Sequence, residues 1–310
     1  MCFLKSNFNF LKNLQNLKKL KLKLTCNVIA RPVFKEPNNQ LTHLYLSACK
    51  LVISDKTIFN DLKRLKHLDL SEVTLADNVL PELFNGINQL ESLALKKTTF
   101  KPVQDAFIYL KNLRELNTRE MRIPEECSNI FVPLKIIQKL DMSSFGPLNI
   151  TALGQVKHLR ELKLVFFSIE IDKNFLDNHP NLESLDLSIL NLSSNAKFNI
   201  DLKALSDLKS LKSLKLSNNN LSAKQYNEIF CFENLETLDL SNCYTNVMNR
   251  ELNLNEKTFE RMKNLKVLNL KGNKIKLVGN CFMHSANLRE LDLSQTALNS
   301  DKNYEIFSSL

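Results

Sequence analysis

Apolar residues, mainly leucine, recur along this chain in a fixed short pattern, LxxLxLxx(N/C/T)x(L), in which many of the x positions are polar. Twelve segments match the pattern, and their first residues lie 22 to 30 residues apart, mostly 23 to 25. The segments begin at Leu17, Leu41, Leu65, Leu90, Leu113, Ile137, Leu159, Leu182, Leu211, Leu235, Leu265 and Leu288. They cover almost the whole chain, so the sequence predicts one structural unit repeated in phase.

Each segment predicts a short β-strand. In LxLxx the side chains alternate, so the two leucines are expected to point into a core while the residues between them face outward. A single unit cannot bury its apolar side alone, and stacked neighbours would form a parallel sheet of twelve strands, roughly 55 Å long at about 4.8 Å per strand. Between the strands, the spacing F-xx-(L/I/M)-xx-L, as in Phe59, Leu62 and Leu65, predicts a short helical turn on the opposite side.

This pattern resembles the leucine-rich repeat. The resemblance predicts an α/β fold of the leucine-rich-repeat class: a curved, horseshoe-shaped solenoid with a parallel β-sheet on its concave face and short helices, turns and loops on its convex face. Residues 1–310 are expected to form a single solenoid of about 12 repeats. A unit near 24 residues with a phenylalanine on its back is similar to the typical, mainly extracellular subclass. The phrases FERMKNLKVLNLKGNKIK and ENLETLDLSNC resemble the ectodomains of Toll-like receptors.

Neither end of the sequence reads as a cap. Stable solenoids need terminal units with a polar outer face, and extracellular members of the resembled class usually have cysteine-clustered caps. The seven cysteines here are scattered and form no CxxC pair. The chain begins inside a back-side segment and stops at FSSL (307–310), which reads as the start of a thirteenth unit. We therefore expect a solenoid uncapped at both ends, either cut from a longer array or produced from an incomplete gene.

The ninth position of each unit departs from the resembled pattern, in which a buried Asn ties neighbouring coils together. Thr and Cys can make a weaker version of that hydrogen bond, whereas Val, Met, Phe and Leu cannot. From the fifth unit to the eighth no polar residue occupies the position, which predicts a missing ladder and altered local curvature. This ladderless block resembles the Toll-like receptors that bind lipid or lipid-carrying ligands. The column reads Thr25, Cys49, Val73, Thr98, Met121, Phe145, Phe167, Leu190, Asn219, Cys243, Asn273 and Thr296.

The segment LRELKLVFFSIE (159–170) carries the candidate ligand site. Val165 and Phe166 occupy outward columns that elsewhere hold mostly Ser, Lys, Glu or Asn, and the next unit places Ile189 beside Phe166. An apolar cluster on a polar wall is typical of a contact site, so we predict that Val165, Phe166 and Ile189 bind a ligand with Lys163 and Arg160 alongside. The alternative is a local irregularity that turns Phe166 into the core.

Other polar patterns have structural explanations. His43 and His67 share a column in adjacent strands, about 5 Å apart, and two such imidazoles can sense pH, but solvated surface histidines are the favoured interpretation. The Asp–Ser pairs on the inner wall recur with the repeat and are interpreted as repeat surface, not as metal ligands. Three glycosylation sequons, at Asn149, Asn191 and Asn220, do not exceed the roughly four or five expected by chance.

Charge and composition narrow the function further. The net charge of +9 is concentrated in residues 1–50, which hold 9 Lys and Arg against one acid, while the remaining 260 residues carry +1. The basic first strand could contact phosphates, but the even charge elsewhere argues against nucleic acid as the main partner. No catalytic constellation, metal-ligand spacing or Gly-rich loop occurs, so we predict a protein that is not an enzyme and needs no cofactor or metal.

These observations predict a non-catalytic binding module. The resemblance implies part of a Toll-like or related receptor ectodomain, a membrane glycoprotein of innate immunity that binds a protein or lipid-bearing ligand on the extracellular side and signals by dimerisation. The sequence itself contains no signal peptide and no apolar run of the roughly 18 residues that a membrane helix needs. The alternative is a cytoplasmic leucine-rich-repeat adaptor that mediates protein–protein interaction, which the free, scattered cysteines favour.

Overall fold

The computed structural model describes most of the chain and divides it into two compact units. Unit 1 comprises Met1–Ser144 with Leu148–Leu159, and unit 2 comprises Phe145–Pro147 with Arg160–Leu310. The prediction that residues 1–310 form one uninterrupted solenoid stays a prediction. The described residues are 14–23, 27–29, 34, 40–47, 51–77, 79–121, 123–127, 129–143, 150–165, 169–171, 173–189, 198–200, 202–243, 251–296 and 298.

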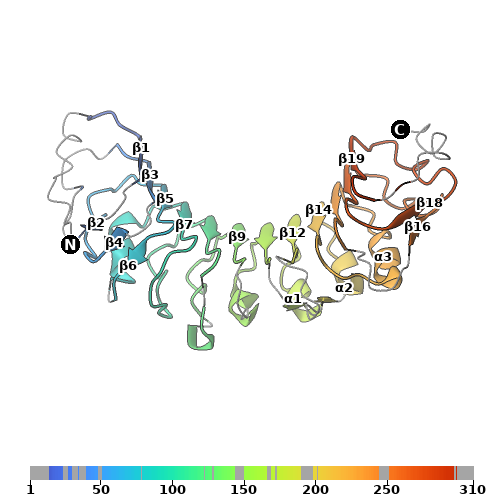
Figure 1. Cartoon of the computed structure of the whole chain (residues 1–310). Coiled ribbons are helices and arrows are strands. Elements are labelled where there is room, and N and C mark those ends of the chain that lie inside the picture. The colour runs from blue at the N-terminus through green and yellow to red at the C-terminus, as the bar shows by residue number, and fades with distance from the viewer. Residues whose placement is uncertain are drawn as a thin grey trace. The chain divides into compact units, whose positions relative to one another are not determined.

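Unit 1 is built on a parallel main sheet in which strands that follow each other in the repeat pattern are neighbours (Figure 1). The register keeps the repeat in phase, since Leu44 lies opposite both Leu20 and Leu68. In β3 the leucines are buried and the residues between them are partly exposed, as the alternation predicts. The main strands are β1 (Lys19–Lys23), β3 (His43–Ser47), β5 (His67–Asp69), β7 (Ser92–Ala94), β8 (Glu115–Asn117) and β9 (Lys139–Asp141).

The back of unit 1 carries a second, smaller sheet and short 3-10 helices. Figure 1 shows β2, β4 and β6 on the far side of the coil from β1, β3 and β5. The back elements are β2 (Asn27–Ile29), β4 (Leu51–Ile53), β6 (Thr74–Leu75), η2 (Glu82–Ile87), η3 (Glu125–Cys127) and η4 (Ile150–Gln155). In each described repeat of unit 1, the chain therefore runs from a main strand to a back segment and then to the next main strand.

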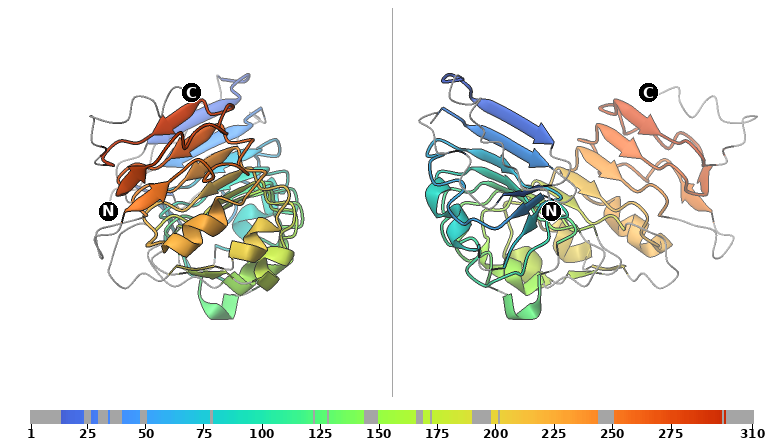
Figure 2. Two further views of the ribbon diagram at one scale, coloured as in Figure 1. Left: turned by 90° about the vertical axis from the view of Figure 1, so that its right-hand side faces the viewer. Right: turned by 60° about the vertical axis from the view of Figure 1, so that its left-hand side comes forward.

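Unit 2 repeats this plan with more helix on its back. Its main strands pair in parallel in the order β10 (Glu161–Lys163), β12 (Ser184–Asp186), β14 (Ser213–Lys215), β15 (Thr237–Asp239), β17 (Val267–Asn269) and β19 (Glu290–Asp292). Figure 2 shows the helices of this unit on the side opposite to the main strands. The back elements are β11 (Ile169–Ile171), α1 (Lys173–Asp177), β13 (Phe198–Ile200), α2 (Leu202–Ser206), α3 (Ala223–Ile229), β16 (Leu252–Leu254) and β18 (Ile275–Leu277).

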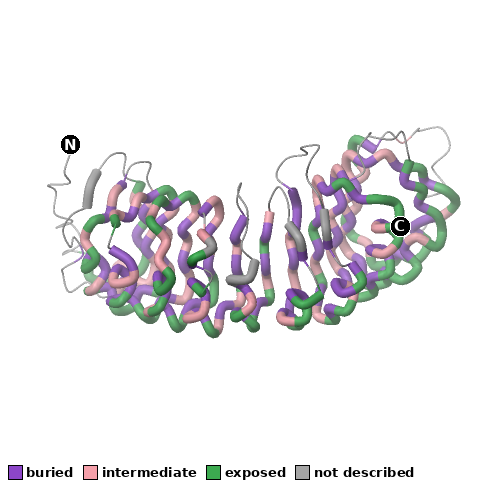
Figure 3. Tube along the Cα trace, turned by 90° about the horizontal axis from the view of Figure 1, so that it is seen from below, coloured by how far each residue is buried: buried purple, intermediate pink, exposed green. Residues whose placement is uncertain are grey.

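The core of each unit is filled by the residues that the spacing selects. Phe59, Leu62 and Leu65 are at most 3% exposed, and successive N–H groups donate three residues back, from Leu62 to Phe59 and from Leu65 to Leu62. An i to i−3 turn brings residues three apart to the same side, which explains the F-xx-L-xx-L pattern. Figure 3 shows buried residues recurring from coil to coil in the described parts of both units.

Phenylalanines from successive coils also contact one another on the back. In unit 1 the ring centroids of Phe84 and Phe107 are 6.4 Å apart, and those of Phe107 and Phe131 are 6.2 Å apart. In unit 2 Phe259 stacks on Phe282 at 5.5 Å. Burial of each such side chain stabilises the stack by about 1.5–3 kcal/mol. The parallel sheet, the alternation and the apolar back confirm the predicted leucine-rich-repeat solenoid fold.

Candidate ligand-recognition surface

The outward-facing residues of the main sheets form the surface that a ligand could reach in each unit. We number the positions of every repeat from its first patterned residue, so that Leu182 is position 1 and Asp186 is position 5. Positions 3, 5, 7 and 8 face outward or lie in the turn after the strand, and together we call them the wall. Positions 4 and 6 are buried leucines in most repeats, as Leu185 and Leu187 show, and position 6 is Thr118 or Met142 in two repeats of unit 1.

Where position 5 is Asp or Asn, its side chain stabilises the turn after the strand. The Asp carboxylates accept a hydrogen bond from the backbone N–H two residues later, over 2.8 Å for Asp69 and 3.1 Å for Asp186. Asn117 and Asn269 accept the same bond at 3.0 Å. These side chains accept a backbone N–H two residues on, as in an Asx turn, and so stabilise the turn. The recurrence of Asp and Asn at position 5 therefore has a structural cause and does not indicate a ligand site. Within the described residues, no three His, Cys, Asp or Glu side chains gather as a metal would require.

Position 8 adopts a left-handed backbone in most described repeats. Its N–H donates to the position-7 carbonyl of the next repeat, for example from Glu72 to Lys96 over 2.8 Å. A positive φ costs little for Gly or Asn and more for bulky β-branched residues. The residues with positive φ at this position are Glu72, Lys97, Glu120, Asn218, Asn242, Gly272 and Gln295.

Ile189 is the exception at position 8, and it corrects the predicted site. Its backbone lacks the positive φ of its counterparts, because a β-branched side chain would be strained there. The N–H of Ile189 still donates to the carbonyl of Ser217 over 2.9 Å, and Asn218 Nδ2 donates to the carbonyl of Ile189 over 3.0 Å. The side chain is 5% exposed. The prediction that Ile189 projects outward is therefore wrong.

The other predicted site residues have different outcomes. Lys163 is exposed at position 5, opposite Asp186 of the next strand, and Val165 lies partly exposed on the same side, since Leu164 between them is buried. Arg160 at position 2 is exposed and forms a 2.9 Å ion pair with Glu183. Phe166 lies outside the described residues. A ligand role for these four residues stays a prediction.

The position-9 ladder joins neighbouring repeats at Thr98, Asn219, Cys243 and Asn273, whereas the hydroxyl of Thr296 donates to Leu293 within its own repeat. Asn219 Nδ2 donates to the position-6 carbonyl of the preceding repeat over 3.1 Å, and Asn273 does so over 2.8 Å. Thr98 and Cys243 make the same bond with Oγ1 and Sγ, over 2.7 and 2.8 Å. Met121 is buried at this position without such a group. The prediction that Thr and Cys can make the hydrogen bond of the usual Asn is therefore confirmed at Thr98 and Cys243. Phe145, Phe167 and Leu190 lie outside the described residues.

An ionic ladder at position 2 was missed by the sequence reasoning. Lys66 Nζ lies 2.6 Å from Glu91, and Lys266 Nζ lies 2.6 Å from Glu236 in unit 2. The lysine hydrogen bond lowers the pKa of each glutamate below its ordinary value. These pairs are exposed, so solvent screens them and they contribute little to stability. The alternation of charge along position 2 was the signal that could have found them.

The two predicted neighbours His43 and His67 lie side by side on the wall of unit 1. They are in register on β3 and β5, and their rings stack with centroids 4.2 Å apart. Lys19 is the register partner of His43 on β1, and its Nζ lies 5.2 Å from the ring centroid of Tyr45. This cluster combines two imidazole rings with the Lys19 ammonium group on an accessible face.

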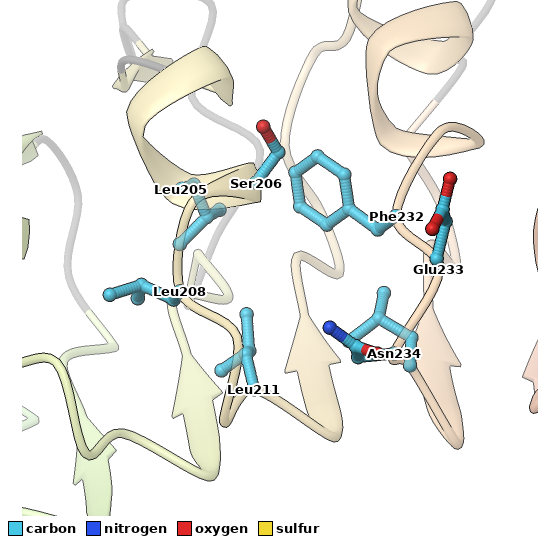
Figure 4. Close-up of a pocket in the computed structure, with 8 residues that line it drawn as sticks. Leu205, Ser206, Leu208, Leu211, Phe232, Glu233 and Asn234 are labelled. Atoms are coloured by element: carbon cyan, nitrogen blue, oxygen red, sulfur yellow. The ribbon is translucent and has the colours of Figure 1, made fainter.

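The back of unit 2 contains a shallow notch between neighbouring coils (Figure 4). Figure 4 shows Phe232 facing the α2 turn that carries Leu205 and Ser206, with Glu233 at the rim. The notch has room for about one water molecule, so it is too small for an organic ligand. The wall is therefore a better candidate for ligand binding than this notch.

Sequence comparison identifies the repeat and one vertebrate relative. Residues 186–244 and 248–298 match the Leucine rich repeat family. The chain is 28% identical over 241 residues to the transforming growth factor beta activator LRRC33 of zebrafish, Danio rerio, covering 77% of this chain and 33% of that protein. The chain spans a third or less of the length of the curated relatives that it matches. Among the described residues, no helix has the length and apolar character to cross a membrane.

Structure comparison finds the same coil in solved proteins. An internalin of Listeria monocytogenes aligns with a TM-score of 0.65 at 19% identity, over 96% of this chain and 80% of that one. Toll of Drosophila, in its complex with Spatzle, aligns with a TM-score of 0.55 at 18% identity, over 87% of this chain and 42% of that one. The repeats, the parallel main sheets and these likenesses lead to one conclusion. The chain is a leucine-rich-repeat protein whose fold resembles that of Toll-like receptor ectodomains.

Proposed function

We propose that this chain is the ligand-recognising part of a Toll-like or related receptor ectodomain on the extracellular side of the plasma membrane. It binds a protein or lipid-bearing ligand on the wall of unit 2 around Lys163, Val165 and Phe166, and the receptor passes the signal on by dimerisation. The leucine-rich-repeat fold is typically a non-catalytic binding module, and nothing in the sequence or the fold points to enzymatic activity.

One observation carries the location of the contact. Position 7 holds Ser, Lys or Arg in eleven of the twelve repeats, and Val165 is its one apolar residue. Val165 is partly exposed and lies on the same side as the exposed Lys163. An apolar side chain beside a lysine suits a ligand that presents an acyl chain or apolar side chain next to an anionic group.

Two comparisons support the recognition role. Toll is known from its complex with Spatzle, so a coil of this kind can accept a protein ligand. The zebrafish relative is described as an activator of transforming growth factor beta. Both proteins are longer than this chain, which is why their partners support only the class of function proposed here.

Vesicle binding tests the proposal. Phosphatidylcholine vesicles that carry a diacylated lipopeptide are the probe, and plain phosphatidylcholine vesicles are the reference. We expect the doped vesicles to bind the protein and the double substitution Val165→Ser with Phe166→Ser to weaken binding about tenfold or more, since a lost apolar contact of about 1.5 kcal/mol has that effect.

Val267→Ser provides the matched control, because Val267 is also a partly exposed valine on the wall of unit 2. It should leave vesicle binding unchanged. Equal binding by the double variant would refute the site. A collapse of the melting temperature in the double variant would show instead that Val165 and Phe166 belong to the core.

A further inference from the structure

The stacked histidines of unit 1 form a cluster that the proposed receptor contact on unit 2 does not use. His43 and His67 come from adjacent strands, β3 and β5, at directly paired positions. Their ring planes are inclined by only 14°, with centroids 4.2 Å apart. Both side chains are partly exposed, so solvent and a ligand can reach the rings.

Cations surround this pair on the β1 side. Lys19 is opposite His43, and Lys21 is opposite Tyr45, and both lysines are exposed on the wall. The Nζ of Lys19 lies 5.2 Å from the Tyr45 ring centroid, a cation–π arrangement that holds the ammonium group above the wall beside His43. The cluster therefore presents the positive charges of two lysines beside two imidazole rings, a group that gains a proton in acid.

The acidic groups near the pair are already engaged. On β5, Asp69 accepts a hydrogen bond from the N–H of Ser71 over 2.8 Å. At the next repeat, Glu91 is bound to Lys66 over 2.6 Å. The following strand, β7, places the neutral Ser92 opposite His67. Both carboxylates keep their negative charge in these bonds, and the Lys66 hydrogen bond and the charge of His67 both contribute to the lowered pKa of Glu91. These two groups therefore balance only part of the charge of Lys19, Lys21 and two imidazolium rings.

The pair resists double protonation in the free protein. Burial lowers the pKa of His43 below its ordinary value, and the charges of His67 and Lys19 lower it further. The Nδ1 of His43 also lies 2.8 Å from Thr42 Oγ1, which fixes the ring orientation. Two stacked cations repel each other, so an anion bound across both rings would remove the obstacle to protonation.

We propose that His43, His67 and Lys19 form an oxyanion-binding site whose affinity increases as the pH falls, and that its ligand carries a phosphate or carboxylate group. The three side chains come from three consecutive strands of one sheet, so a single oxyanion or two adjacent ones can contact them together. This inference does not rest on the proposed receptor function, since it uses other residues in the other unit.

Linkage fixes the direction and size of the effect. A bound anion raises the pKa of each imidazole that it contacts, so binding takes up protons and is favoured in acid. A rise of about one pKa unit in one imidazole corresponds to about a tenfold gain in affinity between neutral and acid pH. Two imidazoles acting together give up to about a hundredfold.

Isothermal titration with pyrophosphate and with oxalate tests the site at about pH 7.5 and about pH 5.5, at constant ionic strength. For one or both probes, we expect the dissociation constant at about pH 5.5 to be at least about tenfold lower than at about pH 7.5. Binding of pyrophosphate alone would identify phosphate ligands, and binding of oxalate alone would identify carboxylate ligands. The double substitution His43→Gln with His67→Gln corrects for the probes' own titration and should abolish the gain.

His158→Gln is the matched control, because His158 is an exposed histidine of the same unit outside the cluster. It should retain the full acid gain. No binding of either probe in acid, equal affinity at both pH values, or an acid gain that survives the double substitution would each overturn the proposal. If the double variant fails to fold, imidazole NMR titration of the unmodified protein decides: added probe must raise the apparent pKa values of His43 and His67 together.

Discussion

The ladder of position 9 makes a quantitative prediction at Asn273. This residue is 1% exposed, and its Nδ2 donates to the carbonyls of Leu240 and Leu270 over 2.8 and 2.7 Å. Its Oδ1 accepts a hydrogen bond from Tyr226, 47 residues away along the chain, over 3.1 Å. Asn273 therefore connects its own coil to the preceding repeat and to the back helix α3.

The substitution Asn273→Ala removes all three of these side-chain bonds. The Leu270 carbonyl retains the backbone N–H of residue 273 at 3.4 Å, so its loss is partial. The Leu240 carbonyl loses its ladder bond, which costs a buried group about 1–3 kcal/mol, and the Tyr226 hydroxyl loses the bond described above. We therefore expect the free energy of unfolding to fall by about 2–4 kcal/mol.

Asn264→Ala is the matched control. Asn264 Nδ2 also donates to a backbone carbonyl of the preceding repeat, that of Glu233, over 3.0 Å, but it does so in an exposed position. Water replaces that bond, so the substitution should cost less than about 1 kcal/mol. Urea unfolding followed by far-ultraviolet circular dichroism measures both variants. Equal losses would refute the claim that burial gives the ladder its importance.

Three further predictions follow from single positions. Gly86→Ala should cost about 1–3 kcal/mol in urea unfolding, because its Cβ would lie 2.4 Å from the backbone of the neighbouring coil, whereas Gly154→Ala meets nothing within 4 Å and should be neutral. At about pH 8, iodoacetamide should label the exposed Cys231 faster than Cys281, whose pKa burial raises to about 12; equal rates by peptide mass spectrometry would contradict this. The lowered pKa of His43 means that the unfolded chain binds more protons, so stability should fall as the pH drops below about 6.5, and His43→Gln should reduce that slope in urea unfolding.

Much of the fold could be predicted because the same apolar pattern occurs in twelve successive segments of the sequence. The LxLxx alternation predicts two leucines in the core of each repeat, and the buried Leu185 and Leu187 agree with that pattern, whereas Leu291 and Leu293 of the last described repeat are only half-buried. The pairing of His43 with His67 followed from equal positions in consecutive units, since in-phase parallel strands bring such residues together. Predictions that depend only on the phase of the repeat were therefore reliable.

The site was harder to predict because it depends on local backbone geometry. The sequence pattern predicts that the side chain at position 8 faces outward in every repeat. This prediction holds for residues that tolerate a left-handed backbone, such as Asn218. Ile189 cannot follow them without strain, and its side chain is buried instead. The ion pair between Arg160 and Glu183 was also missed, because the prediction considered each segment alone and not the charge alternation between segments.

Reading the full-length native transcript through both ends of this segment tests the central claim most directly. The receptor account predicts a signal peptide upstream, and a membrane span followed by a cytoplasmic signalling domain downstream. A start codon at residue 1 and a stop codon directly after residue 310 would contradict it and would favour a free-standing adaptor.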